Sequence, residues 1–263
     1  MAQVRRAMLR KAMAVAVLWS VVACQAGADA PHAGHEAAGV DFGVHCAPAV
    51  RKDFDGALAL LHHMTYPQAR AAFRSIAQRD PKCAMAHWGV AMTLFQPLWP
   101  TRPDLEDRKL GWEEVQRARA IGTSDPRERL FIDAAAAFFE DPASDDYWTR
   151  IHRWADATER AHEAFPQDVD ATTFEALALL ATTPQDRATR DNADHAAALL
   201  LPVLKAHPDH PGAMHYLVHA DDVPGREHDN ADVVRRYEQE APDNPHALHM
   251  PTHVYTREGD WAG

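Results

Sequence analysis

Basic residues are scarce in this sequence, in which 27 Lys and Arg stand against 38 Asp and Glu and the formal net charge is −11. A chain with this balance is a poor partner for nucleic acid or for an anionic lipid surface, so we expect neither kind of binding. Runs of four to eight residues that alternate between apolar and polar, bounded by turn signals, are missing as well. Such runs mark β-strands, and the sequence therefore predicts an all-α protein.

Signatures of the common enzyme classes are also missing. The chain has no Gly-x-Ser-x-Gly nucleophile elbow, no glycine-rich phosphate loop and no His-Glu-x-x-His motif. The neighbouring carboxylates Asp145 and Asp146 need not face one another and are better interpreted as a helix cap. We name no catalytic residue, and we expect the protein not to be an enzyme unless a bound metal supplies the chemistry.

The apolar run near the N-terminus covers only residues 12–22 and is too short to span a membrane as a helix. Four basic residues precede this run and small residues follow it, which is the order of a secretory signal. Removing the signal takes away these basic residues and no acidic ones, so the net charge becomes −15 (−11 − 4). The sequence thus predicts an exported, strongly acidic protein.

Two cleavage sites compete at the end of this signal. Residues 21–24 (Val-Val-Ala-Cys) resemble a bacterial lipobox, which predicts a signal peptide over residues 1–24 and a lipid on Cys24. Cleavage after Ala30 is the alternative. We expect a protein that is either periplasmic or anchored to the outer membrane, with the lipid on Cys24 as its only membrane contact.

Cysteine is rare, with three residues in the chain. If Cys24 carries a lipid, Cys46 and Cys83 remain as a pair in an oxidising compartment, and a disulfide between them is the expected use. Two buried thiols are the alternative. Residues 25–44 are rich in Ala, Gly and His without periodicity, and we expect them to form a flexible tether.

Two stretches near the end of the chain match each other at a constant offset. Residues 207–219 align with residues 241–253, and every matched pair is separated by the same interval (253 − 219 = 34). A helix–turn–helix solenoid repeat has this period, about 34 residues. The matched pairs are Pro208 with Pro242, Asp209 with Asp243, Pro211 with Pro245, Ala213 with Ala247, His215 with His249 and His219 with His253.

Helical periodicity covers most of the chain from Arg51 onward, interrupted by proline-marked turns. We expect helices over residues 51–64, 67–79, 83–95, 105–121, 127–140, 145–165, 169–181, 193–206 and 245–257.

Proline-marked helix ends such as Asp80-Pro81 and Ala164-Phe-Pro166, and the Gly259-Asp-Trp261 turn, are typical of tetratricopeptide (TPR) repeats. More narrowly, the chain resembles a family of exported bacterial TPR proteins from about Gly43 to its end. This resemblance implies export and a TPR-like solenoid of helical hairpins over residues 45–263. The stretches that carry it are Leu60-Leu-His-His-Met64, Cys83-Ala-Met-Ala-His-Trp-Gly-Val-Ala-Met92, His215-Tyr-Leu-Val-His-Ala-Asp-Asp222 and Ala247-Leu-His-Met-Pro-Thr-His253.

Members of this family usually continue with further repeats, whereas the sequence stops at Gly263. The helix expected over residues 245–257 then lacks a partner, and solenoids need a polar capping helix. We expect either a solenoid that is truncated at its C-terminus or an oligomer that covers this uncapped helix. In both cases we expect no later element of the chain to cover the apolar side of this helix, which includes Leu248 and Val254.

Both matched stretches contain a His-x-x-x-His pair, and histidines four apart lie on one face of a helix. In TPR repeats these positions of the first helix line the concave groove, so the resemblance implies that His215, His219, His249 and His253 converge there. Neutral imidazole is a ligand for zinc, copper, nickel or iron. Nearby side chains that could complete or orient such a site are Asp221, Asp222 and His228, and His62 and His87 are expected to face the same groove.

Two classes of function follow from the sequence. The first is an exported TPR scaffold whose concave groove, lined by the four histidines, binds a peptide or partner protein in the cell envelope. The second is a metal-binding protein or metal-dependent enzyme that holds a divalent transition metal, zinc or copper, in the histidine cluster. Metal analysis of the mature protein separates the two.

Overall fold

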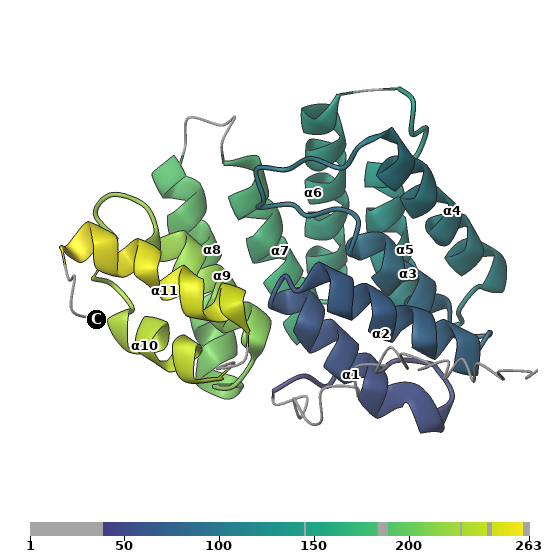
Figure 1. Ribbon diagram of the computed structural model, residues 1–263, viewed down its shortest axis with the longest axis horizontal. Helices are drawn as coiled ribbons and strands as arrows, with labels where there is room; N and C mark the ends of the chain where they lie inside the picture. Colours follow the sequence, from purple (N-terminus) through teal and green to yellow (C-terminus); the bar gives the residue numbers. More distant parts are fainter. Residues whose placement is uncertain (1–38, 145, 184–188, 227, 241–243, 260–263) are drawn as a thin grey trace, which may run out of the picture. The chain divides into compact units, whose positions relative to one another are not determined.

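The structure is a computed structural model that describes residues 39–259, except for 145, 184–188, 227 and 241–243 (Figure 1). The expected signal peptide, Cys24, Ala30 and residues 25–38 of the expected tether lie outside this part of the chain. The described residues form eleven α-helices and no β-strand, which confirms the all-α prediction. None of the described helices combines the length and the apolarity that crossing a membrane requires. The helices are α1 (Pro48–His62), α2 (Tyr66–Arg79), α3 (Ala84–Met92), α4 (Leu105–Ile121), α5 (Pro126–Phe139), α6 (Tyr147–Ala164), α7 (Val169–Thr182), α8 (Thr189–Ala206), α9 (Pro211–Asp221), α10 (Ala231–Glu240) and α11 (Pro245–Glu258).

Side chains with cap chemistry begin several of these helices. The Asp104 carboxylate accepts a hydrogen bond from the backbone N–H of Asp107 at 2.8 Å, and Asp146 accepts one from Trp148 at 2.8 Å. Each bond satisfies an N–H group that has no partner within its own helix. Asp146 is therefore a cap, as its place before an amphipathic segment predicts.

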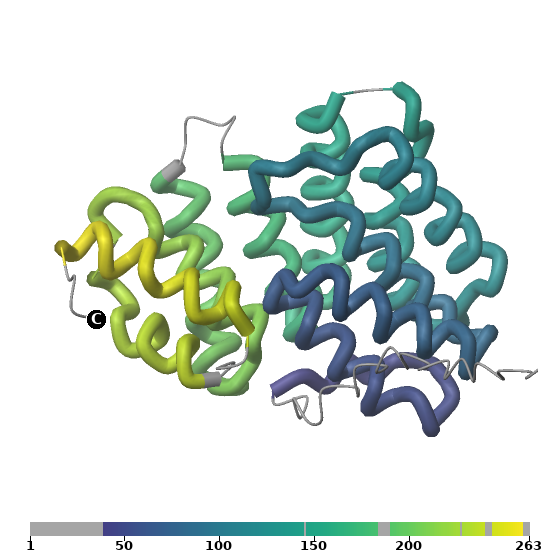
Figure 2. The backbone as a smooth tube through the Cα atoms, in the orientation of Figure 1, coloured from purple at the N-terminus to yellow at the C-terminus, as the bar shows by residue number. Residues whose placement is uncertain are grey.

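Each helix packs against the next one along the chain, as Figure 2 allows the reader to follow. Among the odd-numbered helices, α1 and α3, α3 and α5, α7 and α9, and α9 and α11 also contact each other. Within the described residues, each even-numbered helix contacts only its neighbours in the sequence. One further contact joins distant parts of the chain, because α1 packs against α9. This contact brings the end of α1 to the helix that carries His215 and His219.

The odd-numbered helices do not begin at a constant interval. The starts of α9 and α11, Pro211 and Pro245, reproduce the offset found in the sequence (245 − 211 = 34). The starts of the earlier odd-numbered helices, Pro48, Ala84, Pro126 and Val169, are spaced more widely and unequally (84 − 48 = 36, 126 − 84 = 42, 169 − 126 = 43, 211 − 169 = 42). This variation explains why only the last interval is visible as a sequence repeat.

Residues 40–44 belong to the folded core. Val40, Phe42 and Val44 are 7%, 2% and 3% exposed, and the Phe42 ring lies against three buried aromatic rings. This packing corrects the expected tether boundary at residue 44. The ring centroids of Phe54, Trp88 and Phe131 lie 5.3, 6.0 and 5.3 Å from that of Phe42.

Polar contacts hold the same segment in place. Arg127 lies 3.9 Å above the Phe42 ring and donates a hydrogen bond to the Phe42 carbonyl at 2.9 Å. Asp55 accepts a hydrogen bond from the Phe42 N–H at 3.1 Å. Gly39 has φ of +78° and approaches the backbone of Asp209 so closely that a Cβ atom would lie 2.2 Å from its oxygen. Only glycine fits at this position, because the positive φ is unfavourable for other residues and a Cβ atom would clash with the Asp209 backbone.

A disulfide joins Cys46, just before α1, to Cys83, just before α3. Their Cα atoms are 4.8 Å apart, within the range that a disulfide requires. This geometry supports the pairing expected from the sequence. The bond fixes the segment that contains Phe42 close to the start of α3.

The apolar side of α11 is largely covered. Val254 is 1% exposed and Met250 is 2% exposed, whereas Leu248 is 47% exposed. The apolar side of this helix is therefore uncovered at Leu248 and covered at Val254. Helices α9 and α10 both contact α11, and together they supply its covering.

Glu175 on α7 is a buried carboxyl group whose Oε2 has no hydrogen-bond partner among the described residues. Burial, together with the charges of Glu159 and Glu163, raises the pKa of Glu175 from 4.5 to about 7. The folded chain therefore binds this proton more tightly than the unfolded chain does. The free energy of unfolding therefore falls as Glu175 ionises, between pH of about 4.5 and pH of about 7. Above that range Glu175 causes no further decrease.

We expect Glu175→Gln to raise the free energy of unfolding by about 1–2 kcal/mol near pH 8, because the amide has no charge to bury. The gain should disappear as the pH is lowered toward 5, where Glu175 is itself neutral when folded. Urea denaturation of both proteins across this pH range measures the difference. Glu106→Gln, at a carboxylate whose side chain is 79% exposed, is the control. A gain for Glu175→Gln that does not vary with pH would contradict the assignment.

Candidate functional site

Helices α9 and α11 pack against each other (Figure 1). Five of their histidines lie close together there. Both helices begin with a proline and are capped by the preceding side chain, since His210 accepts from the Ala213 N–H and Asn244 accepts from the His246 N–H. The matched starts give the two helices a common register. Helix α9 contributes His215 and His219, and α11 contributes His246, His249 and His253.

His215 is fully buried, and its ring is fixed on both sides. Its Nδ1 lies 2.6 Å from the backbone oxygen of His62, and its ring stacks on Tyr237 with centroids 5.2 Å apart. Because a carbonyl oxygen only accepts, Nδ1 of His215 carries the proton and Nε2 has a lone pair. That Nε2 lies 3.1 Å from Nε2 of His246.

His219 lies one turn beyond His215, with ring centroids 5.0 Å apart. Its Nε2 is buried and has no hydrogen-bond partner among the described residues. One ring nitrogen from each of His215, His219 and His246 can be chosen so that all three lie within 4.8 Å of one another. We refer to these three histidines as the inner site.

His249 and His253 form a second group on the outer side of α11, which we refer to as the outer pair. Their Nε2 atoms are 2.9 Å apart, and the ring centroids of His246 and His249 are separated by 6.3 Å. Nδ1 of His253 lies 3.0 Å from Oδ2 of Asp222. The outer pair is therefore next to the inner site and open to solvent, because His249 is exposed and the His253 side chain is 39% exposed.

The four histidines singled out in the sequence thus lie in one continuous cluster, divided between two groups. The structure brings His215 and His219 to His246, which is not one of the repeat-matched histidines. His246 lies three residues before His249 and so on a neighbouring part of the same helix face. The three-residue spacing of His246 and His249 was the one sequence feature that could have pointed to His246. Which of the two lies beside His215 depends on the axial alignment of α9 with α11.

The other residues expected near the site are only partly found there. Asp222 contacts the outer pair, whereas Asp221 accepts hydrogen bonds from Arg226 and Asn230, and His228 lies 3.0 Å from Glu258. His62 touches the inner site through its backbone oxygen. His87 lies instead against Glu114, with Nδ1 2.6 Å from its Oε2.

Burial keeps the inner histidines neutral at neutral pH. It lowers the pKa of His219 to about 3 and that of His246 to about 4, and it holds the pKa of His215 well below the usual 6.5. Neighbouring imidazoles lower these pKa values further, because two protonated rings repel each other. Neutral imidazole is the form that coordinates a metal.

A second group of buried polar side chains, His62, Asp170 and His210, resembles a metal site but lacks the required tautomer. Nε2 of His62 and Nε2 of His210 lie 3.7 and 3.8 Å from Oδ1 of Asp170. Nδ1 of His210 accepts a hydrogen bond from the Ala213 N–H at 3.1 Å. In a neutral ring the proton must then be on Nε2, and that nitrogen has no lone pair for a metal.

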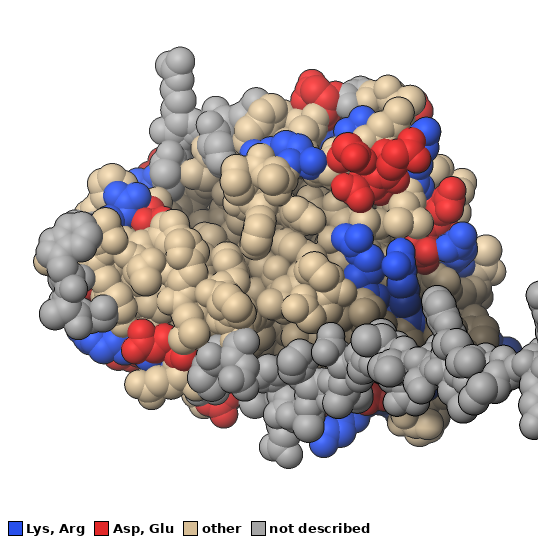
Figure 3. Space-filling model, in the orientation of Figure 1, with Lys and Arg blue, Asp and Glu red and all other residues tan. Residues whose placement is uncertain are grey.

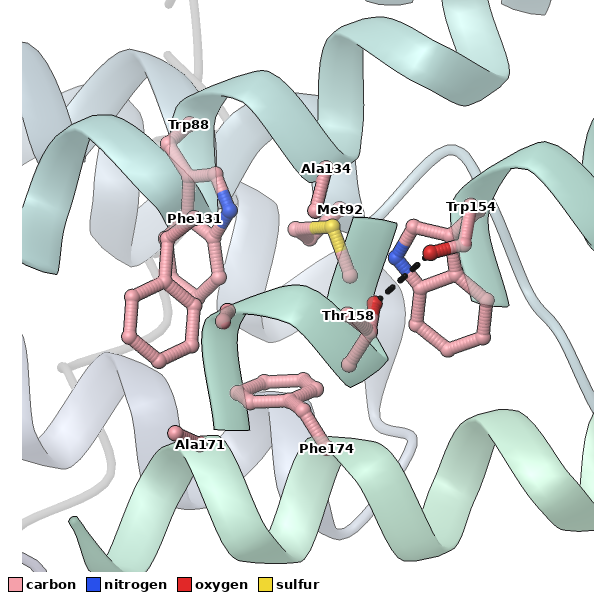
Figure 4. Close-up of a pocket in the computed structure, with 9 residues that line it drawn as sticks. Trp88, Met92, Phe131, Ala134, Trp154, Thr158, Ala171 and Phe174 are labelled. Atoms are coloured by element: carbon pink, nitrogen blue, oxygen red, sulfur yellow. Dashed lines mark hydrogen bonds between the residues drawn. The ribbon is translucent and has the colours of Figure 1, made fainter. Parts of the chain in front are cut away.

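The apolar cavity in Figure 4 has no role in such chemistry. It encloses about 10 Å³, which is room for about one water molecule. Thr158 is its one polar lining residue, and the Thr158 hydroxyl already donates to the Trp154 carbonyl. The other labelled side chains are Trp88, Met92, Phe131, Ala134, Trp154, Ala171 and Phe174.

We find no match between this chain and the known protein families or the curated proteins. Its chemistry must therefore be inferred from the histidine cluster itself. The inner site offers three neutral imidazoles in a buried place, and the outer pair offers two more at the surface.

Proposed function

We propose that this protein binds a divalent transition metal, zinc or copper, through His215, His219 and His246. The observation that carries the proposal is the buried Nε2 of His219, which lacks a hydrogen-bond partner among the described residues and lies beside two further imidazoles. A buried polar atom without a partner costs about 1–3 kcal/mol. One metal ion would bind all three rings and remove that cost.

The environment of His215 supports the same proposal. A histidine that binds metal through one nitrogen generally donates its other N–H to a carboxylate or a backbone carbonyl, which fixes the tautomer and the ring orientation. His215 makes this bond to the His62 carbonyl and directs its Nε2 lone pair toward His246. The 3.1 Å between these two Nε2 atoms is close to the separation of two nitrogens held at about 2.0–2.1 Å from one ion.

The scaffold that we propose for this site is a TPR-like solenoid of helical hairpins. The repeat-length interval between the starts of α9 and α11 and the side-by-side packing of odd-numbered helices support it. Export and lipidation of Cys24 belong to the same proposal and rest on the sequence signals alone.

Recognition of a peptide or partner protein remains the second candidate, and the exposed residues on α11 favour it. Leu248 is 47% exposed and His249 beside it is also exposed. A peptide lying over α11 could contact both, although the buried His215 would be out of its reach. Figure 3 shows the side of the molecule that carries α11, where uncharged residues fill the centre and charged ones lie toward the margins.

The test of metal binding uses the mature protein, stripped with a chelator and titrated separately with Zn²⁺ and Cu²⁺. We expect His219→Leu with His246→Ala to weaken binding at the inner site by at least about 100-fold, because two of its three ligands are lost. Isothermal titration calorimetry and elemental analysis measure affinity and stoichiometry. Helical content, followed by circular dichroism, should stay nearly unchanged.

His228→Ala is the matched control, because His228 is a histidine with a 75% exposed side chain that lies against Glu258. Metal binding by this variant should equal that of the wild type. If the double variant binds metal with wild-type affinity and stoichiometry, the inner site is not a metal site. If neither the double variant nor the wild type binds metal, peptide recognition is the remaining candidate.

A further inference from the structure

The outer pair has its own arrangement of orienting contacts. The Asp222 carboxylate can only accept, so Nδ1 of His253, 3.0 Å from Oδ2, carries the proton and Nε2 keeps a lone pair. Arg257 donates to Oδ1 of the same carboxylate and so holds Asp222 in place. A carboxylate that fixes a histidine in this way is the usual outer partner of a metal-bound imidazole.

The spacing within the outer pair also suits one ion. Two nitrogens bound at about 2.0–2.1 Å and at about a right angle lie about 2.9 Å apart. The Nε2 atoms of His249 and His253 are 2.9 Å apart. A right angle between nitrogens is characteristic of tetragonal Cu²⁺ or Ni²⁺, and the exposed side leaves the remaining positions to water.

We propose that His249 and His253, oriented by Asp222, form a second metal site that captures a tetragonal divalent ion, Cu²⁺ above all, from solvent and passes it to the inner site. This inference rests on the proposed function of the inner site for the transfer step, whereas capture depends on the outer pair alone. His246 connects the two groups, since its ring centroid lies 4.9 Å from that of His215 and 6.3 Å from that of His249.

The transfer is a series of ligand exchanges without a change of oxidation state. Without an ion, His249 donates its Nε2–H to the lone pair on His253, and His246 donates its Nε2–H to His215. When the ion binds His249, the proton leaves Nε2 for solvent and Nδ1 takes one up, so the ring stays neutral. The same exchange frees Nε2 of His246, which then replaces an outer ligand as the ion moves inward.

The acidity of the protein favours capture at the surface. A net charge of −11 raises the local concentration of cations around the molecule. The inner site is reached less directly, because His215 is fully buried and Nε2 of His219 is covered. A surface pair of imidazoles is therefore expected to increase the rate at which an ion reaches the buried ligands.

The experiment compares the wild type, an outer variant (His249→Ala with His253→Ala) and an inner variant (His219→Leu with His246→Ala) of the mature protein. Cu²⁺ titration should give two equivalents for the wild type and one for each variant. Nitrogen couplings in the electron paramagnetic resonance spectrum should show two imidazoles in the inner variant and three in the outer variant. Asp222→Asn should retain both sites but weaken the outer one about 10-fold or more.

Stopped-flow loading tests the transfer. At limiting Cu²⁺, the outer variant should fill the inner site at least about 10-fold more slowly than the wild type, with its equilibrium affinity unchanged. His228→Ala should load at the wild-type rate. Equal rates for the outer variant and the wild type would overturn the transfer step.

The two proposals fail in different ways. If the wild type takes up one equivalent and the outer variant retains it with the same affinity, the second site does not exist while the inner site stands. If instead the inner variant retains the wild type's whole capacity, the inner site fails and the outer pair is the metal site. A single equivalent that both variants lose would mean one shared site, which also overturns the inference.

Discussion

Replacing Phe42 by alanine is expected to lower the free energy of unfolding by about 3–5 kcal/mol, the usual cost of removing a buried phenylalanine ring. The ring is 2% exposed and packs against the rings of Phe54, Trp88 and Phe131. Its loss would leave a cavity at the centre of the contacts between the N-terminal segment and α1, α3 and α5. Urea denaturation followed by circular dichroism measures the change.

Leu105→Ala serves as the comparison, because this side chain is 39% exposed and its truncation should cost less than about 1 kcal/mol. A Phe42→Ala protein as stable as Leu105→Ala would show that residues 40–44 are not packed in solution. The comparison therefore separates a core segment from the flexible tether suggested by its composition.

Removing the disulfide is the second change with a large expected effect. Cys46→Ser with Cys83→Ser should lower the free energy of unfolding by about 4 kcal/mol, since the bond closes a loop across a sequence separation of 37 in the unfolded chain. The difference in denaturation midpoint between oxidised and reduced wild type should match that of the variant. Each serine should reproduce the full loss when introduced alone.

Thiol titration gives the independent check. In unfolded but unreduced protein, neither Cys46 nor Cys83 should react, and both should react after reduction. Two reactive thiols before reduction would mean that the bond does not form. The stability difference would then have to come from the serines themselves.

Many helix positions were predictable because apolar residues recur at helical spacing and because prolines or capping side chains mark many of the helix starts. The expected range 105–121 coincides with α4, and the expected range 169–181 differs from α7 by one residue. These signals lie within each segment, so they can be read from the sequence without knowledge of the fold. The earlier odd-numbered helices begin at unequal intervals, so no constant offset between them can be read from the sequence.

The packing of residues 40–44 and the contact of His215 with His246 were not predictable in the same way. Phe42 is a single aromatic residue in a stretch of Ala, Gly and Val, and its burial depends on side chains from α1, α3 and α5. The partner of His215 depends on the axial alignment of two helices, which a shift of one turn would change. Such tertiary alignments leave no periodic trace in one sequence.

The contact between α1 and α9 has a consequence for how the protein assembles. In an open array each repeat touches only its neighbours, and folding can start at any repeat and spread. Here the ring of His215 is held by the backbone oxygen of His62, 153 positions earlier in the chain. A nascent chain must therefore release almost all of its helices before the inner site can take its final form. An ion that binds only the completed inner site would stabilise the folded chain relative to every partly folded state. At an ion concentration about 100 times its Kd, the added stabilisation free energy is about 2.7 kcal/mol.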